Sequence, residues 1–383
     1  MLAFDKCFRK SLLFPGSKNG LAAKISEVCK LALYTHCLSH RLNLAVSGAF
    51  DIPEFGLILT QMESILSFFL SSPNRTTLLE KIIEVEGGTE NPRKKSLIHF
   101  CRTRWSQRGK TFERFVEAYP YLFKALSAII GTEPCPEGFV VSYIDKIKST
   151  ALGFKKTLSD STFIVGINIM YVYTGALNSI TDKLQGKSLD IITGYKEINS
   201  HIFDFKSIRN NIDVRFKKDI WNYSEAMAEK VDITIESPRV SSRSVYRSGP
   251  GSDSAEDHFR TTLCIPFLDK MIAQLTERFS NNTSEIVTGL MCLVPSVLIT
   301  LSDEEIEKKS QTLIEFYSLD IKSPRLLSAE IAILKARFTD MSATAMDEIP
   351  DTIASTLKYL KVHPYSPMYR DLLRIAATIP VTR

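Results

Sequence analysis

The sequence predicts a mainly α-helical soluble protein, and three observations favour this fold class. Apolar residues recur every three or four positions along most of the 383 residues, which is the period of an amphipathic helix. Stretches with the alternating pattern of a strand are short and few. Hydrophobic residues make up 44% of the chain and charged residues 24%, as in ordinary globular proteins. This composition excludes a mainly disordered, collagen-like or membrane-spanning chain.

The helical pattern is clearest in the N-terminal half. Leu57, Ile58 and Phe69 follow one face of a helix that we expect to stop near Pro73. A second apolar stripe covers 111–130. Further helices are predicted at about 139–152, 160–184, 188–209, 217–231, 256–280, 303–317, 325–338, 351–361 and 366–378.

Two stretches carry strand-like signals. Residues 31–35 are apolar and β-prone, and a helix is expected to follow them with Ser39 as its N-cap. Residues 231–235 alternate apolar and polar side chains. The longest apolar stretch, 163–177, is shorter than the roughly 20 residues needed to cross a bilayer. Since it also contains Asn168, we interpret it as a buried helix.

A linker is predicted at 237–255, which is rich in serine, proline and glycine and lacks the periodicity of a packed element. Arg239, Arg243 and Arg247 recur every four residues within it. We therefore divide the chain at this segment.

Charge and cysteine usage limit the classes of function. The 48 Lys and Arg exceed the 43 Asp and Glu by five, so any nucleic-acid binding has to come from a local cluster. Seven scattered cysteines without a Cys-x-x-Cys pair predict reduced thiols, as in the cytosol or nucleus. Charged residues interrupt the apolar positions at the N-terminus, which argues against a secretory signal.

The densest basic window is 91–110, which contains seven Lys and Arg and no Asp or Glu. Such a cluster can neutralise phosphates, and a tryptophan ring inside it can stack on an unpaired base. The alternative is a solvated basic loop whose tryptophan anchors the next helix in the core. The nucleic-acid-binding residues that we predict are Arg102, Arg104, Trp105, Arg108 and Lys110.

A group of His and Cys residues raises the question of zinc. Cys37 and His40, which follow His36 within the sequence 36–40, match half of a zinc site. His99 and Cys101 offer two further ligands. The alternative, which we favour, is that Cys37 and His40 are packed or hydrogen-bonded groups at a strand-to-helix corner. We therefore predict no metal and no other cofactor.

No motif predicts an enzyme. The chain has no Gly-rich phosphate loop, no Gly-x-Ser-x-Gly and no His-Glu-x-x-His. The acidic run at 303–307 is interpreted as a helix start, where acidic side chains complement the helix dipole. We therefore name no catalytic residue.

Several blocks of sequence, in order, resemble transposases of the hAT superfamily. Residues 36–46 resemble the Cys-x-x-His stretch of that family, and 19–25 fit the part just upstream. Thr103, Arg104 and Trp105 resemble its Thr-Arg-Trp motif. In active relatives the matching tryptophan stacks on DNA bases near the cleaved end, so the resemblance implies a DNA-facing Trp105.

Later blocks resemble a narrower group. Residues 238–243, 259–260 and 265–269 are similar to the animal subgroup often called repressor-of-the-inhibitor-of-the-protein-kinase-like or zinc-finger-MYM-like. Residues 372–382 resemble the start of the family's C-terminal dimerisation region.

The resemblance covers about 17–383 and implies an RNase H-like α/β core that a large helical insertion interrupts. On this basis 1–50 is expected to be a remnant of the core, 51–236 the helical insertion domain, and 256–383 a helical region leading into a truncated dimerisation region. We expect 1–50 to pack poorly, because it lacks the central strands of its sheet. Limited proteolysis should then trim the N-terminus first.

The family also implies an Asp-Asp-Glu triad that holds Mg²⁺. The first Asp belongs to a strand upstream of this chain, and the second should lie shortly before Asn19, where 8–15 contain no acidic residue. The Glu should follow 379–381, and the chain ends at Arg383. Without these carboxylates nothing holds the metal that activates water for strand cleavage.

We therefore predict a catalytically inert, transposase-derived protein that is not an enzyme. Its expected partners are a second copy of the chain, another protein or, weakly, DNA, but no membrane, and the nucleus is its expected location. One alternative is a fragment of an active Mg²⁺-dependent transposase clipped at both ends. Another is a helical scaffold without any nucleic-acid role.

Overall fold

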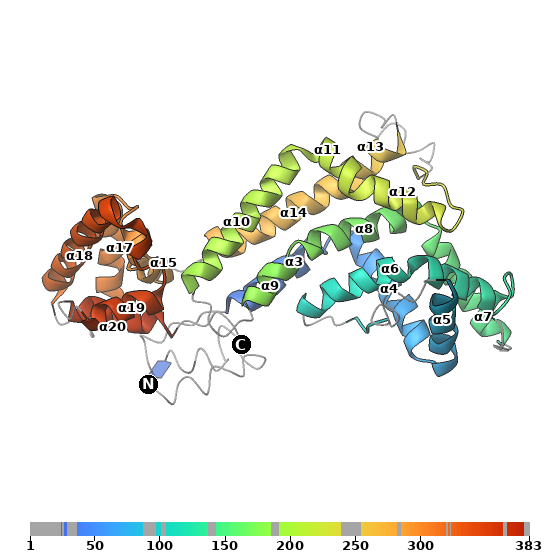
Figure 1. The fold of residues 1–383 in the computed structure, drawn as a ribbon, viewed down its shortest axis with the longest axis horizontal. Helices are drawn as coiled ribbons and strands as arrows, with labels where there is room; N and C mark the ends of the chain where they lie inside the picture. Colours follow the sequence, from blue (N-terminus) through green and yellow to red (C-terminus); the bar gives the residue numbers. More distant parts are fainter. Residues whose placement is uncertain are drawn as a thin grey trace. The chain divides into compact units, whose positions relative to one another are not determined.

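The computed structural model confirms the mainly helical fold class (Figure 1). Every regular element among the described residues is a helix, and no strand occurs in them. The RNase H-like core stays a prediction. The structure describes residues 24, 27–28, 37–86, 97–100, 105–136, 143–184, 191–238, 254–281, 285–318, 321, 323–362 and 366–378.

The chain divides into two compact units. The first unit consists of Met1–Leu42, Lys183–Ser200 and Glu277–Arg383, and the second of Asn43–Asp182 and His201–Thr276. The predicted linker lies mostly outside the described residues, and the structured parts on both sides of it belong to the second unit. The helices at 201–229 and 255–276 are therefore packed into one core, as the stacked rings of Trp221 and Phe259 show.

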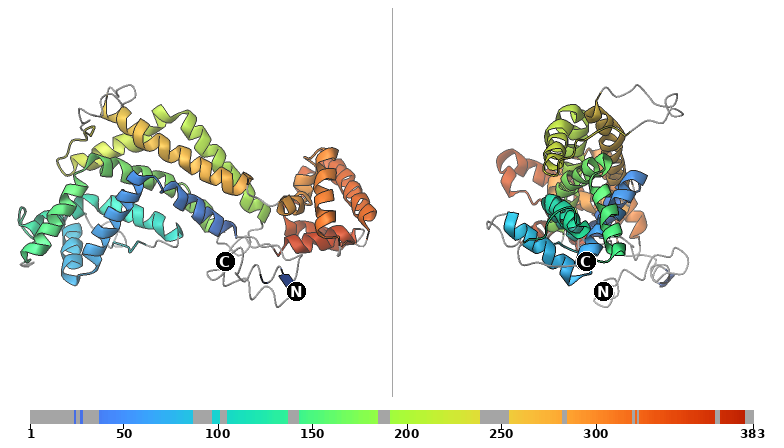
Figure 2. Two further views of the ribbon diagram at one scale, coloured as in Figure 1. Left: turned by 180° about the vertical axis from the view of Figure 1, so that it is seen from behind. Right: turned by 90° about the vertical axis from the view of Figure 1, so that its right-hand side faces the viewer.

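The second unit is built mainly from the helices in the middle of the chain (Figures 1 and 2). Three short segments, labelled η3, η4 and η5, are π-helical. The segments η3 and η4 lie within otherwise α-helical stretches, and η5 directly follows α14 and belongs to the first unit. The helices from α3 to η5 are α3 (Leu38–Ala49), α4 (Pro53–Leu70), α5 (Pro73–Glu86), α6 (Trp105–Ile130), α7 (Asp145–Leu158), α8 (Ser161–Gly175), α9 (Asn178–Leu184), α10 (Ile191–Asn210), α11 (Ile212–Phe216), η3 (Lys217–Trp221), α12 (Asn222–Glu229), α13 (Ala255–Phe259), η4 (Arg260–Cys264), α14 (Ile265–Thr276) and η5 (Glu277–Asn281).

Helix α8 is the central helix of the second unit. It packs against α4, α6, α7 and α12, and is apolar around most of its circumference. Its Asn168 is buried and donates from Nδ2 to the carbonyl oxygen of Ile164 at 2.9 Å. The interpretation of 163–177 as a buried helix is therefore confirmed for α8. The stretch Ser161–Leu184 is long and apolar enough to cross a membrane, yet 67% of its most apolar window is buried inside the protein. The helices α3 and α4 are bent by 104° relative to each other, and together they are long and apolar enough to cross a membrane only if the pair is counted as one span.

An aromatic cluster joins α8 to the surrounding helices. The ring of Phe267 on α14 lies 4.6 Å from that of Phe55, 5.4 Å from that of Phe50 and 6.3 Å from that of Tyr173. The Phe50 ring in turn lies 6.4 Å from that of Phe112 on α6. These rings are all buried in the hydrophobic core of the second unit.

The C-terminal third forms most of the first unit. Its helices are α15 (Glu285–Cys292), α16 (Pro295–Leu298), α17 (Asp303–Phe316), α18 (Pro324–Thr344), the 3₁₀ segment η6 (Met346–Glu348), α19 (Ile353–Val362) and α20 (Pro367–Ala376). Ser302 and Glu305 form a reciprocal capping box at the start of α17, with N–H to oxygen distances of 3.2 and 2.9 Å. The acidic run is therefore a helix start, as predicted.

Some predictions about single elements are wrong. Residues 231–235 are irregular rather than a strand, because this segment has no neighbouring strand to pair with among the described residues. The helix predicted at 160–184 breaks after Gly175 into α8 and α9. Pro73 both follows the end of α4 and begins α5, a helix that the sequence did not reveal, since proline suits the first helical turn.

The expectation that 1–50 pack poorly is wrong for 37–50. Leu38, Leu42, Val46 and Ala49 of α3 are all buried. Their three- and four-residue spacing places them on one face of the helix. The strand predicted at 31–35 lies outside the described residues.

Candidate nucleic-acid interface

Three of the five predicted nucleic-acid-binding residues lie in the first turns of α6. This helix starts at Trp105, and its first turns include Arg108 and Lys110. The side chain of Lys110 is exposed. Arg102 and Arg104 lie outside the described residues, as do the side chains of Trp105 and Arg108. The structure therefore locates the backbone of three of the five predicted residues at one helix N-terminus.

The first turns of α6 are fixed by packing against α9. A Cβ atom placed on Gly109 would lie only 2.0 Å from Oδ1 of Asn178, so the two helices approach each other at a residue without a side chain. The next residues, Thr111 and Phe112, are fully buried. Lys110 is thus an exposed lysine among buried neighbours in the first turns of α6.

The chain that leads toward this helix start is also anchored. Leu97 is buried, and the ring of Phe100 lies edge-on to that of Phe112 at 6.1 Å. His99 between them is exposed. Phe100 therefore holds the chain on the aromatic cluster immediately before Arg102 and Arg104.

The electrostatics at the start of α6 favour an anion. The first turn contains no acidic side chain, and the first acid after Trp105 is Glu113. The free N–H groups at a helix N-terminus carry about half a positive charge. Here Arg108 and Lys110 add full positive charges to it. A phosphate group is the ligand that this combination suits.

The possible zinc ligands do not converge among the described residues. Cys37 is buried and sits just before α3, where its Sγ accepts the N–H of His40 at 3.4 Å and its carbonyl accepts that of Arg41 at 3.0 Å. Cys37, rather than the predicted Ser39, is therefore the N-cap of this helix. His36 and Cys101 lie outside the described residues, and no group of three metal-binding side chains forms in the part that the structure describes.

Two residues of the 259–260 and 265–269 blocks form ion pairs within the second unit. Arg260 bonds to the carboxylates of both Asp213 and Asp257. Asp269 accepts from Arg209 at 2.8 and 3.3 Å. Asp213 lies 47 residues from Arg260, and Arg209 lies 60 residues from Asp269, so no local pattern could reveal these two pairs.

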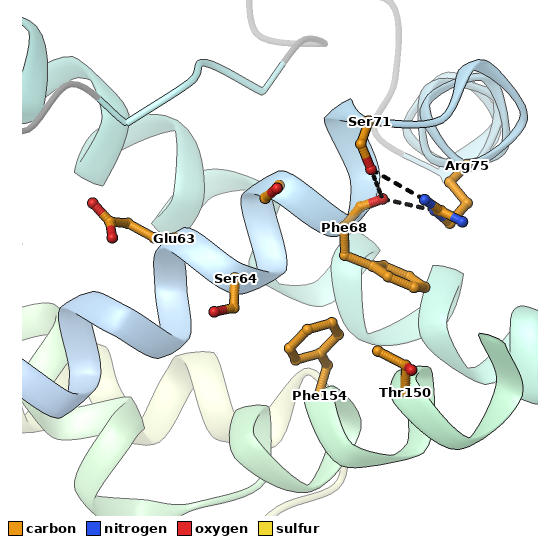
Figure 3. Close-up of a pocket in the computed structure, with 8 residues that line it drawn as sticks. Glu63, Ser64, Phe68, Ser71, Arg75, Thr150 and Phe154 are labelled. Atoms are coloured by element: carbon orange, nitrogen blue, oxygen red, sulfur yellow. Dashed lines mark hydrogen bonds between the residues drawn. The ribbon is translucent and has the colours of Figure 1, made fainter. Parts of the chain in front are cut away.

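One open groove was not predicted from the sequence. It has a volume of about 450 Å³ and lies between α4, α5 and α7 in the second unit (Figure 3). The sequence pattern that could have revealed the groove is a row of serines spaced three and four residues apart along α4 and its C-terminal end, which lie on one face of a helix. Its lining consists of Glu63, Ser64, Ser67, Phe68, Ser71, Arg75, Thr150 and Phe154.

Comparison with known proteins gives two informative relatives. The chain is 25% identical over 374 residues to the mouse (Mus musculus) protein named 52 kDa repressor of the inhibitor of the protein kinase, and equally identical to its human (Homo sapiens) counterpart. The similarity covers 97% of this chain and 47% of each relative, so the chain spans about half the length of the curated relatives that it matches. No family model and no solved structure matches the chain.

Proposed function

We propose that this chain is an interaction module derived from an hAT-type transposase, which binds DNA weakly and assembles with protein partners. The observation that carries the DNA-binding part is the start of α6, where a helix N-terminus without acidic side chains coincides with the basic window. The name of the two relatives describes a repressor, which is consistent with binding rather than cutting. The module works in the nucleus under this proposal.

The proposed DNA contacts have separate roles. Arg102, Arg104, Arg108 and Lys110 neutralise phosphates, and the ring of Trp105 stacks on an unpaired base. Phosphate contacts make the affinity strongly dependent on salt and nearly independent of sequence. No residue of the module is assigned a cleavage step.

A DNA titration tests this part. The full chain is titrated into a fluorescently labelled single-stranded oligonucleotide at several salt concentrations. Lys110→Ala should weaken binding and reduce the slope of log affinity against log salt by about one. The combined variant Arg104→Ala/Trp105→Ala should weaken it further, because it also removes a stacking ring.

Lys308→Ala is the matched control, since it removes a lysine that is also exposed but lies in an acidic stretch of α17. Its affinity should equal that of the wild type. Failure of the wild type to bind at low salt would favour a helical scaffold. Divalent-dependent nicking that a single Asp or Glu substitution abolishes would show a transposase fragment instead.

We also propose that α18 contributes to assembly, with a second copy of the chain as its partner. Leu326 and Ile333 are 52% and 64% exposed, and seven residues place them on one face of the helix. The small Ala329 and Ala336 are exposed on the same face and allow another helix to approach. The opposite face is already buried in the first unit.

Light scattering after size-exclusion chromatography tests self-association through α18. The wild type should form a dimer, and Ile333→Glu should give the mass of a monomer with an unchanged helical circular dichroism spectrum. Thr339→Glu changes an exposed residue of α18 away from this face and should remain dimeric. A monomeric wild type at micromolar concentration would exclude the proposed homodimer.

A further inference from the structure

The groove between α4, α5 and α7 contains one cation that is held in a fixed position. Arg75 donates from Nε to the carbonyl oxygen of Phe68 at 2.6 Å and from Nη2 to Oγ of Ser71 at 3.2 Å (Figure 3). Its guanidinium carbon lies 4.3 Å from the centre of the Phe68 ring. Three contacts thus fix a side chain that is otherwise among the most mobile.

The fixed guanidinium keeps binding capacity. Arginine has five N–H donors, and these two hydrogen bonds use two of them. The contacts of Arg75 with the described residues are to a carbonyl, a hydroxyl and a ring, and no carboxylate is among them. A pre-organised and uncompensated guanidinium is suited to a carboxylate, which it can bind through two parallel hydrogen bonds.

An apolar surface lies directly beside this cation. The rings of Phe68 and Phe154 are 5.3 Å apart in an edge-to-face arrangement, and both are only partly buried. Figure 3 shows the two rings facing the groove, with Arg75 near Phe68 at one end. If a bound peptide places an apolar side chain on these rings, the carboxylate of the next residue in that peptide can reach Arg75.

We propose that this groove is a docking site for a protein partner that presents an acidic residue next to an aromatic or large apolar residue. The acidic side chain accepts hydrogen bonds from the free N–H groups of Arg75, and the apolar side chain packs on Phe68 and Phe154. The site is separate from the α6 segment and does not depend on DNA binding. It adds a specific chemical class of partner to the proposed interaction module.

The charge of the groove favours a peptide over a nucleic acid. A groove that follows a nucleic-acid backbone lines up several cations. Here a single arginine lies in a lining that also contains the carboxylate of Glu63. A polyanion needs several cations in a row, whereas a single arginine is enough for one carboxylate.

Nuclear magnetic resonance titration of the full chain tests the proposal. The probe is the blocked peptide acetyl-Phe-Asp-Gly-amide, and its Asn analogue is the matched control. The Asp peptide should shift the Nε–H signal of Arg75 and the amide signals of Phe68 and Phe154 in a saturable manner. The Asn peptide should bind at least about tenfold more weakly, because charge-assisted hydrogen bonds are the stronger ones.

Variants separate binding from folding. Arg75→Gln should weaken the Asp peptide about tenfold, but Arg75 also caps the last turn of α4. Thr150→Trp keeps Arg75, fills the groove from α7 and should abolish binding. Ser149→Trp, on the next exposed residue outside the lining, should leave binding unchanged.

Three results would overturn the proposal. They are no saturable shift with the Asp peptide, equal affinity for the Asp and Asn peptides, or binding that Thr150→Trp leaves intact. An octadeoxythymidylate that shifts the same signals more tightly than the Asp peptide would identify a nucleic-acid groove instead. Thr150→Trp should also leave the salt-dependent DNA binding of the α6 segment unchanged, so the two proposals fail independently.

Discussion

The carboxylate of Glu330 on α18 accepts the backbone N–H of Tyr369 at 2.9 Å, at the first turn of α20. Glu330 is 4% exposed, so this contact links two helices inside the first unit. The hydroxyl of Tyr369 donates to the carbonyl oxygen of Leu293 and extends the link to the end of α15. An acidic side chain thus caps a helix N-terminus from a different helix.

Removing this cap should destabilise the first unit. Glu330→Ala leaves the buried N–H of Tyr369 without its acceptor, which costs about 1–3 kcal/mol. Urea unfolding followed by circular dichroism would show the loss as a lower midpoint. Glu307→Ala, which removes an exposed acid from α17, should change the midpoint little.

The same residue should give stability a pH dependence. Burial raises the pKa of Glu330 above its ordinary value of 4.5, so the folded state binds the proton more tightly than the unfolded state. Its contribution to the free energy of unfolding therefore falls as pH rises from 4.5 through the raised pKa. Glu330→Gln should flatten this part of the profile. An identical slope in the variant would show that other groups cause it.

Gly109→Ala should destabilise the second unit, although alanine is normally the better helix former. The added Cβ would lie 2.0 Å from Oδ1 and 2.5 Å from Nδ2 of Asn178. Gly153→Ala on α7 is the matched control, because nothing lies within 4 Å of its added Cβ. That control should stabilise by up to about 1 kcal/mol. Asn178→Ala combined with Gly109→Ala should recover most of the loss, and a purely additive result would contradict the proposed clash.

Arg41 should stabilise the first unit through its aromatic partners. It donates to the Tyr195 hydroxyl at 2.5 Å and lies 5.1 Å from the centre of the Phe279 ring. Arg41→Lys keeps the charge but loses the flat guanidinium, so we expect a loss of about 1 kcal/mol in the free energy of unfolding. Arg374→Lys, at an exposed i,i+3 ion pair, should change the same urea midpoint by much less.

Cys264 should resist alkylation in the folded protein. Burial raises the pKa of its thiol to about 12, so on the order of one molecule in ten thousand carries the reactive thiolate at pH 8. Cys135 is partly exposed, whereas the other three cysteines that the structure describes are buried, so Cys135 should react with iodoacetamide before Cys264. Mass spectrometry of peptides after timed labelling measures both rates. Labelling of Cys264 as fast as Cys135 in the native protein would mean that its helix opens readily.

Periodicity was informative wherever one helix face meets the core. The pattern of Phe112 and its neighbours predicted the apolar face of α6, and the apolar run around Asn168 predicted a buried helix. Periodicity was uninformative about where a helix begins, because a single residue rather than a repeat decides that position. The start of α5 at Pro73 and the capping role of Cys37 are two examples.

The basic window at the candidate site shows the same difference between what the sequence predicts and what only the folded chain reveals. Composition alone identified the positive charges of Arg104 and Lys110, because counting charges needs no partner. Only the folded chain shows that Gly109 meets Asn178 and that Phe100 rests on Phe112. The groove around Arg75 was not visible in the sequence, since its lining comes from three helices.

The sequence by itself determined the helical class of this protein, most of its helix positions and the location of its basic cluster. Those properties depend on residues within a few turns of one another, where spacing and composition act directly. The tertiary structure alone decided which helices share a core, which acid caps α20 and where an arginine is held beside two rings. Such contacts join residues that are far apart in the chain, and packing rather than local propensity brings them together.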